Sequence, residues 1–163
     1  MNHRIGKLGA FTLIEVLVVV VIIGIAGAIV VPQLLAPSSL GTQAAGRAVI
    51  ADIIYAQSDA VAHQKARKVI FDAATDSYRL TDDADTNLVA NWIGGAQYVV
   101  SFSNDSRFQG VTLDNINFGG TSTLEFDDLG SPISGGNLEV VGDTSRYLIS
   151  VAALTGRVTI QPQ

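Results

Sequence analysis

The pattern of hydrophobic and polar positions divides the chain into two parts. From Phe11 to Val31 the only polar side chains are Thr12 and Glu15. A helix of that length extends about 31 Å, which is the thickness of the hydrocarbon core of a bilayer. From about Pro32 onward, apolar and polar residues are mixed as in a soluble domain. We therefore predict a transmembrane helix over residues 11–31 and a soluble region after it.

A second helical stretch is predicted from Leu40 to about Lys68, because its apolar residues recur at three- and four-residue steps. We expect this apolar face to pack on a β-sheet. Arg67 and Lys68 would then lie at the end of the helix, where cations are favourable. The residues that form the expected face are Val49, Ile50, Ile53, Ile54, Ala60 and Val61.

Two prolines lie between these helical stretches. Pro32 cannot donate a hydrogen bond to the carbonyl of Ala28, so the helix is expected to kink or loosen there. Pro37 weakens it further. We predict an interruption between residues 31 and 40, with residues 32–68 as a continuation of the helix.

After Lys68 the hydrophobic period becomes that of β-strands. Residues 69–71 and 78–80 flank a polar turn and predict a hairpin. A long helix followed by short strands predicts an α+β fold with antiparallel sheet over residues 69–163. Residues 88–93 have no clear type. Further strands are expected at residues 97–102, 111–118, 122–126, 137–141, 147–152 and 157–160.

Charge and composition narrow the classes of function. The chain has 163 residues, a net charge of −5 and no cysteine, which excludes disulfides and thiolate metal sites. An acidic chain repels nucleic acid, so we do not expect nucleic acid as a partner. Arg4 and Lys7 precede the apolar run, and the next basic residue is Arg47. This asymmetry places the N-terminus in the cytoplasm and the C-terminal region across the membrane.

The start of the chain resembles a known signature. A short basic leader, a small residue, Phe11-Thr12-Leu13-Ile14-Glu15 and a hydrophobic helix resemble type IV pilins and type II secretion pseudopilins. In that family a prepilin peptidase cuts before the Phe and methylates the new N-terminus. The helix is first an inner-membrane anchor and later the core of a filament. The resemblance implies that residues 1–10 are a leader and that Phe11 is N-methylated.

The cut site departs from the family pattern, which usually has Gly immediately before the Phe. Here the order is Gly9-Ala10-Phe11, so two cuts are open. Cleavage after Ala10 makes Glu15 the fifth residue, as in the family, whereas cleavage after Gly9 makes it the sixth. The spacing from Phe to Glu favours cleavage after Ala10.

Glu15 is a carboxylate inside an apolar run, and two interpretations are open. It could extend to the lipid headgroups. Alternatively, it pairs with the ammonium that cleavage creates at Phe11, one helical turn earlier, which lowers the cost of a buried charge. The resemblance favours pairing between subunits, in which Glu15 registers an incoming subunit. Pilin-like proteins often have a proline at the place of Pro32, where the helix bends or melts in the fibre.

A second resemblance lies in the C-terminal half. Leu124-Glu125-Phe126-Asp127-Asp128-Leu129-Gly130, then Tyr147-Leu148-Ile149-Ser150-Val151 and Leu154-Thr155-Gly156-Arg157-Val158, are similar to the GspH/FimT-type minor pseudopilin domain and its closing hairpin. Residues 82–117 match nothing in that family.

Sites for catalysis, cofactors and metals are not expected. Asp83, Asp85 and Asn87 have the alternate spacing of a calcium loop but lack its Gly and late Glu, so we expect a solvated loop. Asp127 and Asp128 are expected to be a turn pair. His63 is expected to be a surface histidine, and the other histidine lies in the leader, so a histidine triad is excluded.

The sequence therefore predicts a minor pseudopilin that assembles with other pilins and is processed by prepilin peptidase. It would be a single-pass inner-membrane protein with a periplasmic domain, and later part of a periplasmic pseudopilus that assists export of folded proteins. The alternatives are a minor pilin of a type IV pilus or DNA-uptake system, a major pilin, and an enzyme or solute-binding domain on an uncleaved anchor.

Overall fold

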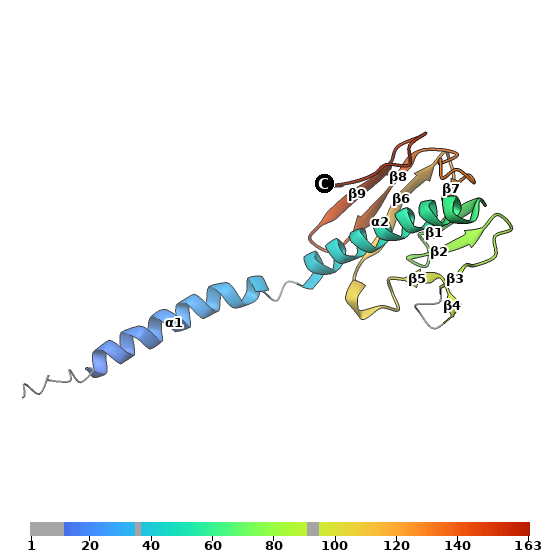
Figure 1. Ribbon diagram of the computed structural model, residues 1–163. Helices are drawn as coiled ribbons and strands as arrows, with labels where there is room; N and C mark the ends of the chain where they lie inside the picture. The colour runs from blue at the N-terminus through green and yellow to red at the C-terminus, as the bar shows by residue number, and fades with distance from the viewer. Residues whose placement is uncertain (1–11, 35–36, 91–94) are drawn as a thin grey trace, which may run out of the picture. The chain divides into compact units, whose positions relative to one another are not determined.

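The computed structural model describes residues 12–34, 37–90 and 95–163 (Figure 1). The chain divides into two compact units, Met1–Ala36 and Pro37–Gln163. In the first unit, helix α1 extends over Leu13–Leu34. Among the described residues, no helix meets the length and apolarity needed to cross a membrane.

The two prolines have different positions in the helices. Helix α1 continues through Pro32 to Leu34, so Pro32 does not end it. Helix α2 extends over Pro37–His63 and begins with a proline. This position suits proline, because the first amide of a helix has no partner within the helix. The end of α1 and the start of α2 both lie inside the interval in which an interruption is predicted.

Helix α2 packs through one narrow stripe of its surface. The stripe recurs at steps of three and four residues and is fully buried, as the 3.6-residue period requires. Two residues of the predicted face, Ile54 and Val61, are instead 48% and 51% exposed, so their assignment to the packed face is wrong. The buried stripe consists of Ala45, Val49, Ile53, Ala56 and Ala60.

The C-terminus of α2 also differs from the prediction. The helix ends at His63, and Gln64 has a positive φ of 51°, a conformation that commonly ends a helix. Arg67 and Lys68 therefore belong to a strand rather than to the last helical turn. The predicted helix extends five residues beyond the observed end, because Arg67 and Lys68 are equally compatible with the start of a strand.

The first sheet is antiparallel and has the strand order β5-β2-β1-β7. Its β1–β2 hairpin has Val69 opposite Leu80 and confirms the predicted hairpin. Strand β7 pairs with the other edge of β1. The strands extend over Arg67–Asp72 (β1), Ser77–Asp82 (β2), Val99–Ser101 (β5) and Thr123–Phe126 (β7).

The second sheet is also antiparallel, with the order β10-β9-β8-β6. Strand β6 contains a bulge in which Asn115 has a φ of 47°. The strands extend over Thr112–Phe118 (β6), Gly136–Val141 (β8), Arg146–Val151 (β9) and Val158–Pro162 (β10). Two short strands, Val89–Ala90 (β3) and Ala96–Gln97 (β4), form a small separate ladder, and a 3₁₀ helix, η2, covers Ser106–Phe108.

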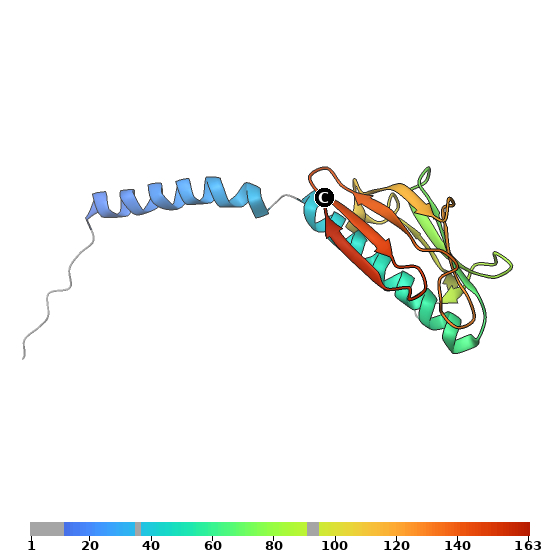
Figure 2. The same cartoon turned by 90° about the horizontal axis from the view of Figure 1, so that it is seen from above.

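Helix α2 lies against strands of both sheets (Figures 1 and 2), so the core of the second unit lies between α2 and the two sheets. Two glycines permit the close approach. A Cβ on Gly46 would lie 3.1 Å from the Cδ1 of Ile160 in β10, and one on Gly41 would lie 3.2 Å from the carbonyl oxygen of Arg107. The predicted α+β fold with antiparallel sheet is confirmed.

Ile53 and Ile54 provide a matched test of this packing. Ile53 is fully buried and Ile54 is 48% exposed. We expect Ile53→Ala to lower the free energy of unfolding by about 2–5 kcal/mol, because it leaves a cavity in the core. Ile54→Ala should lower it by less than about 1 kcal/mol. Urea unfolding followed by circular dichroism measures both, and equal losses would contradict the orientation of α2.

Candidate functional site

The start of α1 is organised by Thr12. Its Oγ1 accepts a hydrogen bond from the backbone N–H of Glu15 at 3.3 Å, and its carbonyl accepts from Glu15 at 3.1 Å and Val16 at 3.3 Å. Thr12 therefore caps the helix, and Glu15 occupies the first turn, where a negative charge is favourable. Thr-x-x-Glu is the spacing of a capping box. Sequence reasoning missed this local role, although the signal was present.

The predicted processing residues lie outside the described part of the chain; they are Gly9, Ala10 and Phe11. The cleavage position and the pairing of Glu15 with a new N-terminus therefore stay predictions. Pro32 lies within α1, and its role in assembly also stays a prediction.

The first half of α1 is apolar on every side. Its large hydrophobic side chains between Leu13 and Ile25 are 47–84% exposed, and Glu15 is exposed among them. A helix with exposed apolar side chains all round is stable only in an apolar environment or against a partner. The described part of α1 therefore presents apolar surface that is unfavourable in water.

In the second unit, Asp52 of α2 accepts hydrogen bonds from two tyrosines. Tyr78 in β2 donates to its Oδ2 at 2.5 Å, and Tyr98, just before β5, donates to its Oδ1 at 2.6 Å. Burial raises the pKa of the Asp52 carboxyl and also the pKa values of both phenols. Both carboxylate oxygens of Asp52 therefore have a hydrogen-bond donor, as buried polar atoms ordinarily do. Because Asp52 lies in α2 and Tyr78 lies in β2, the cluster joins α2 to the first sheet.

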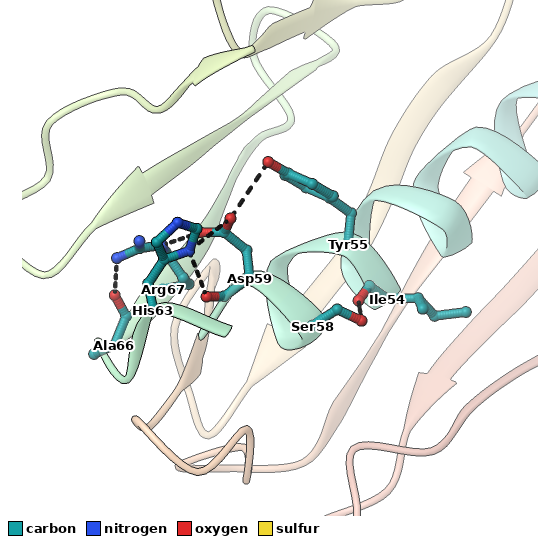
Figure 3. Close-up of polar contacts among 7 residues, drawn as sticks. All are labelled: Ile54, Tyr55, Ser58, Asp59, His63, Ala66 and Arg67. Atoms are coloured by element: carbon teal, nitrogen blue, oxygen red, sulfur yellow. Dashed lines mark hydrogen bonds and ion pairs between the residues drawn. The ribbon is translucent and has the colours of Figure 1, made fainter. Parts of the chain in front are cut away.

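A second cluster surrounds Asp59 at the end of α2 (Figure 3). The Nε of Arg67 in β1 lies 2.5 Å from Asp59 Oδ2, and these side chains are only 8% and 10% exposed. Tyr55 donates to Asp59 Oδ1 at 3.4 Å, and the Nδ1 of His63 lies 3.1 Å from the same oxygen. Arg67 thus holds the end of the helix to β1, and His63 is exposed at its margin, as predicted.

The candidate calcium loop is occupied by a cation of the chain itself. The Nζ of Lys68 donates to Asp85 Oδ1 at 2.8 Å and to the carbonyl oxygen of Asp83 at 2.9 Å. The hydrogen bond to Asp85 raises the pKa of Lys68. The ammonium therefore occupies one carboxylate oxygen of Asp85 and one backbone carbonyl oxygen of this loop. Sequence reasoning missed Lys68 because it lies fifteen residues from Asp83 and meets the loop only across the β1–β2 hairpin.

The other acidic pair forms a turn, as the sequence predicts. Asp127 Oδ1 accepts from the N–H groups of Leu129 at 2.9 Å and Ser131 at 2.8 Å. Within residues 12–34, 37–90 and 95–163, no three His, Cys, Asp or Glu side chains come together in a way that could hold a metal ion.

Comparison with solved structures finds the minor pseudopilin EpsH from the type 2 secretion system of Vibrio cholerae. The match has a TM-score of 0.50 and 11% sequence identity, and it covers 74% of this chain and 96% of that chain. No family model matches the chain, and the search of curated proteins found no significant match.

The likeness to EpsH shows a pseudopilin-like fold for this chain. The prediction of a pilin-like α+β fold is confirmed.

Two of the arginine–carboxylate pairs provide a matched test of the Asp59 cluster. Arg67→Met should lower the free energy of unfolding by about 3–5 kcal/mol, because it leaves the buried Asp59 carboxylate without its cation. Arg146 pairs with Glu139 on the second sheet but is 44% exposed. Arg146→Met should therefore cost at most about 1 kcal/mol. Chemical denaturation measures both, and an equal cost would contradict a structural role for Arg67.

Proposed function

We propose that this chain is a minor pseudopilin, a structural subunit of a type II secretion pseudopilus that assists export of folded proteins. The observation that carries the proposal is the coincidence of two features. One is the prepilin-like N-terminus with Glu15 in the first turn of α1. The other is the pseudopilin-like fold of the chain, which resembles a minor pseudopilin of that system.

In this proposal residues 11–31 anchor the subunit in the inner membrane and later form part of the filament core. The basic residues Arg4 and Lys7 stay in the cytoplasm and are removed by prepilin peptidase. The second unit lies in the periplasm. Three of its acidic side chains, those of Asp59, Asp85 and Asp127, are engaged in ion pairs or a turn, which is in keeping with a structural subunit.

The proposed work of Glu15 is to attract the N-terminal ammonium of another subunit. An exposed carboxylate among apolar side chains is costly in lipid until it meets a cation. Assembly supplies that cation, so the free energy of pairing favours the filament over the free subunit.

Mass spectrometry of the mature N-terminus tests the class of protein. When the chain is co-expressed with prepilin peptidase, we expect loss of ten residues and a methylated Phe11. A start at Ala10 would show cleavage after Gly9 instead. An intact Met1 would overturn the proposal in favour of a domain on an uncleaved anchor.

Substitutions at Glu15 separate its charge from its place in the Thr-x-x-Glu spacing of a capping box. Glu15→Gln keeps a capping-box residue but removes the charge. We expect normal cleavage and at least about tenfold less incorporation into sheared filaments, since one buried charge pair is lost. Glu15→Ala should behave in the same way.

Thr12→Val is the matched control, since it removes the capping oxygen and leaves the charge of Glu15. It should be incorporated better than Glu15→Gln. If Thr12→Val alone abolishes incorporation and Glu15→Gln does not, the capping role explains Glu15 and the pairing hypothesis fails.

A further inference from the structure

Strand β5 forms one outer edge of the first sheet, beside β2 (Figure 1). At one end of the strand, the N–H of Leu80 donates to the carbonyl of Tyr98 at 3.1 Å. At the other end, the N–H of Phe102 donates to the carbonyl of Asp76 at 2.9 Å. Backbone pairing with β2 therefore extends from residue 98 to residue 102, beyond the three residues of β5 itself.

The backbone groups of every second residue in this segment point away from β2. In an antiparallel ladder, hydrogen-bonded pairs alternate with pairs that are not hydrogen-bonded. Because residues 98 and 102 bond to β2, Val100 does so too, whereas Val99 and Ser101 direct their N–H and carbonyl groups to the outer edge. A row of such donors and acceptors is a template for another extended chain.

The three other outer edges of the two four-stranded sheets are protected. The edge of β7 is covered by the segment that follows it, where the N–H of Ile133 donates to the carbonyl of Glu125 at 2.8 Å. Strand β6 has a bulge with Asn115 at a φ of 47°, and β10 ends in Pro162, which has no N–H to donate. Strand β5 contains no charged residue and no proline, and its register with β2 is regular. Its edge is therefore open to pairing.

A hollow of about 640 Å³ lies along this edge, lined by residues 98–101 and 104–107. Consecutive residues of a strand face opposite sides of the sheet. A hollow that touches Val99, Val100 and Ser101 in turn therefore lies beside the strand rather than on one face of the sheet. This is the place that a further strand would occupy.

The far wall of the hollow, residues 104–107, is held by its own contacts. Asp105 Oδ1 accepts from the N–H of Arg107 at 2.9 Å, and the two side chains form an ion pair at 2.6 Å. Directly after the wall, Phe108 is buried and packs edge-to-face on Phe102, with ring centroids 5.1 Å apart. These contacts fix the wall beside the strand and leave the hollow between them.

The side chains next to this edge define the chemistry of a partner. Val99 is 49% exposed, and Arg79, opposite it in β2, is exposed and forms no ion pair among the described residues. The nearby Asp72 is engaged in its own hairpin turn, where its Oδ1 accepts from the N–H of Ala74 at 2.9 Å. A strand added to β5 would lie beside an apolar side chain and a cation, which favour branched apolar and acidic residues.

We propose that the outer edge of β5 binds an extended segment of another protein, which adds to the first sheet as a further strand and occupies the hollow. The backbone of this segment bonds to the N–H and carbonyl groups of Val99 and Ser101. One of its apolar residues packs on Val99, and one of its acidic residues reaches Arg79. The proposal goes beyond the proposed function, because it concerns a surface of the second unit that the N-terminal signature does not involve.

Disulfide tethering tests this edge, because the chain has no native cysteine. Full-length Ser101→Cys in detergent micelles is equilibrated in glutathione buffer with a capped peptide of alternating valine and glutamate around one central cysteine. A control peptide has the same side chains, but every backbone amide is methylated and cannot donate to the strand. We expect at least about fivefold more adduct with the first peptide, which corresponds to one or more backbone hydrogen bonds. Intact-mass spectrometry measures the adduct.

Thr112→Cys is the matched control, since Thr112 is exposed on β6, an edge strand with a bulge. The two peptides should give equal adduct at this position. Equal adduct of the two peptides at Ser101→Cys, or the same preference at Thr112→Cys, would overturn the proposal. A disulfide dimer of Ser101→Cys that excludes the peptide would overturn the choice of another protein as occupant in favour of a second copy.

Two further substitutions, each combined with Ser101→Cys, separate backbone pairing from charge. Val99→Pro removes an outward N–H and leaves the bonds to β2, so the preference for the unmethylated peptide should fall at least about threefold. Arg79→Gln should lower the adduct of the glutamate peptide but not that of a glutamine peptide. Arg157→Gln, at an exposed arginine next to β10, should change neither.

An unchanged preference with Val99→Pro would contradict backbone pairing at this edge. Equal effects of Arg79→Gln and Arg157→Gln would contradict the place of Arg79 in the site. The comparison of the two peptides at Ser101→Cys decides the proposal even where one of these variants does not fold.

Discussion

The structure of the second unit depends on the burial of one stripe of α2 against two sheets. Ala45, Val49 and Ile53 are fully buried, and the small residues bring the helix axis close to the strands. Each four-stranded sheet has a hydrophobic face that needs a cover. One helix covers both, so its register fixes where the sheets lie. The carboxylates of Asp52 and Asp59 reach their tyrosine and arginine partners only in that register.

This packing leaves a helix that is apolar on two sides. The side toward the sheets is buried within the subunit, whereas the side with Ile54 and Val61 is exposed. Exposed apolar surface on a helix costs free energy in water until something covers it. The same holds for residues 13–26 of α1, where the exposed side chains surround the axis. Covering either surface removes apolar area from water, which favours association.

The sequence predicted most of the fold because its strands are short apolar runs bounded by glycines and polar turns. Prediction from the sequence failed where one pattern of residues is compatible with two ways of packing. Ile53 and Ile54 are adjacent and identical, and only the position of the sheets decides which is buried. Arg67 and Lys68 suit a helix end or a strand equally well. The contact between Lys68 and Asp85 joins residues far apart in sequence, so no local pattern could predict it.

Glu15 has two possible contributions, one to the start of its own helix and one to assembly with another subunit. As the third residue of the first turn it favours the helix start, where the free N–H groups and the helix dipole attract a carboxylate. That local role needs an oxygen acceptor and not a full charge, so glutamine would serve it nearly as well. The charge is costly among the apolar side chains of α1. Under the proposed function, the cation that offsets this cost is the N-terminal ammonium with which Glu15 pairs in the filament.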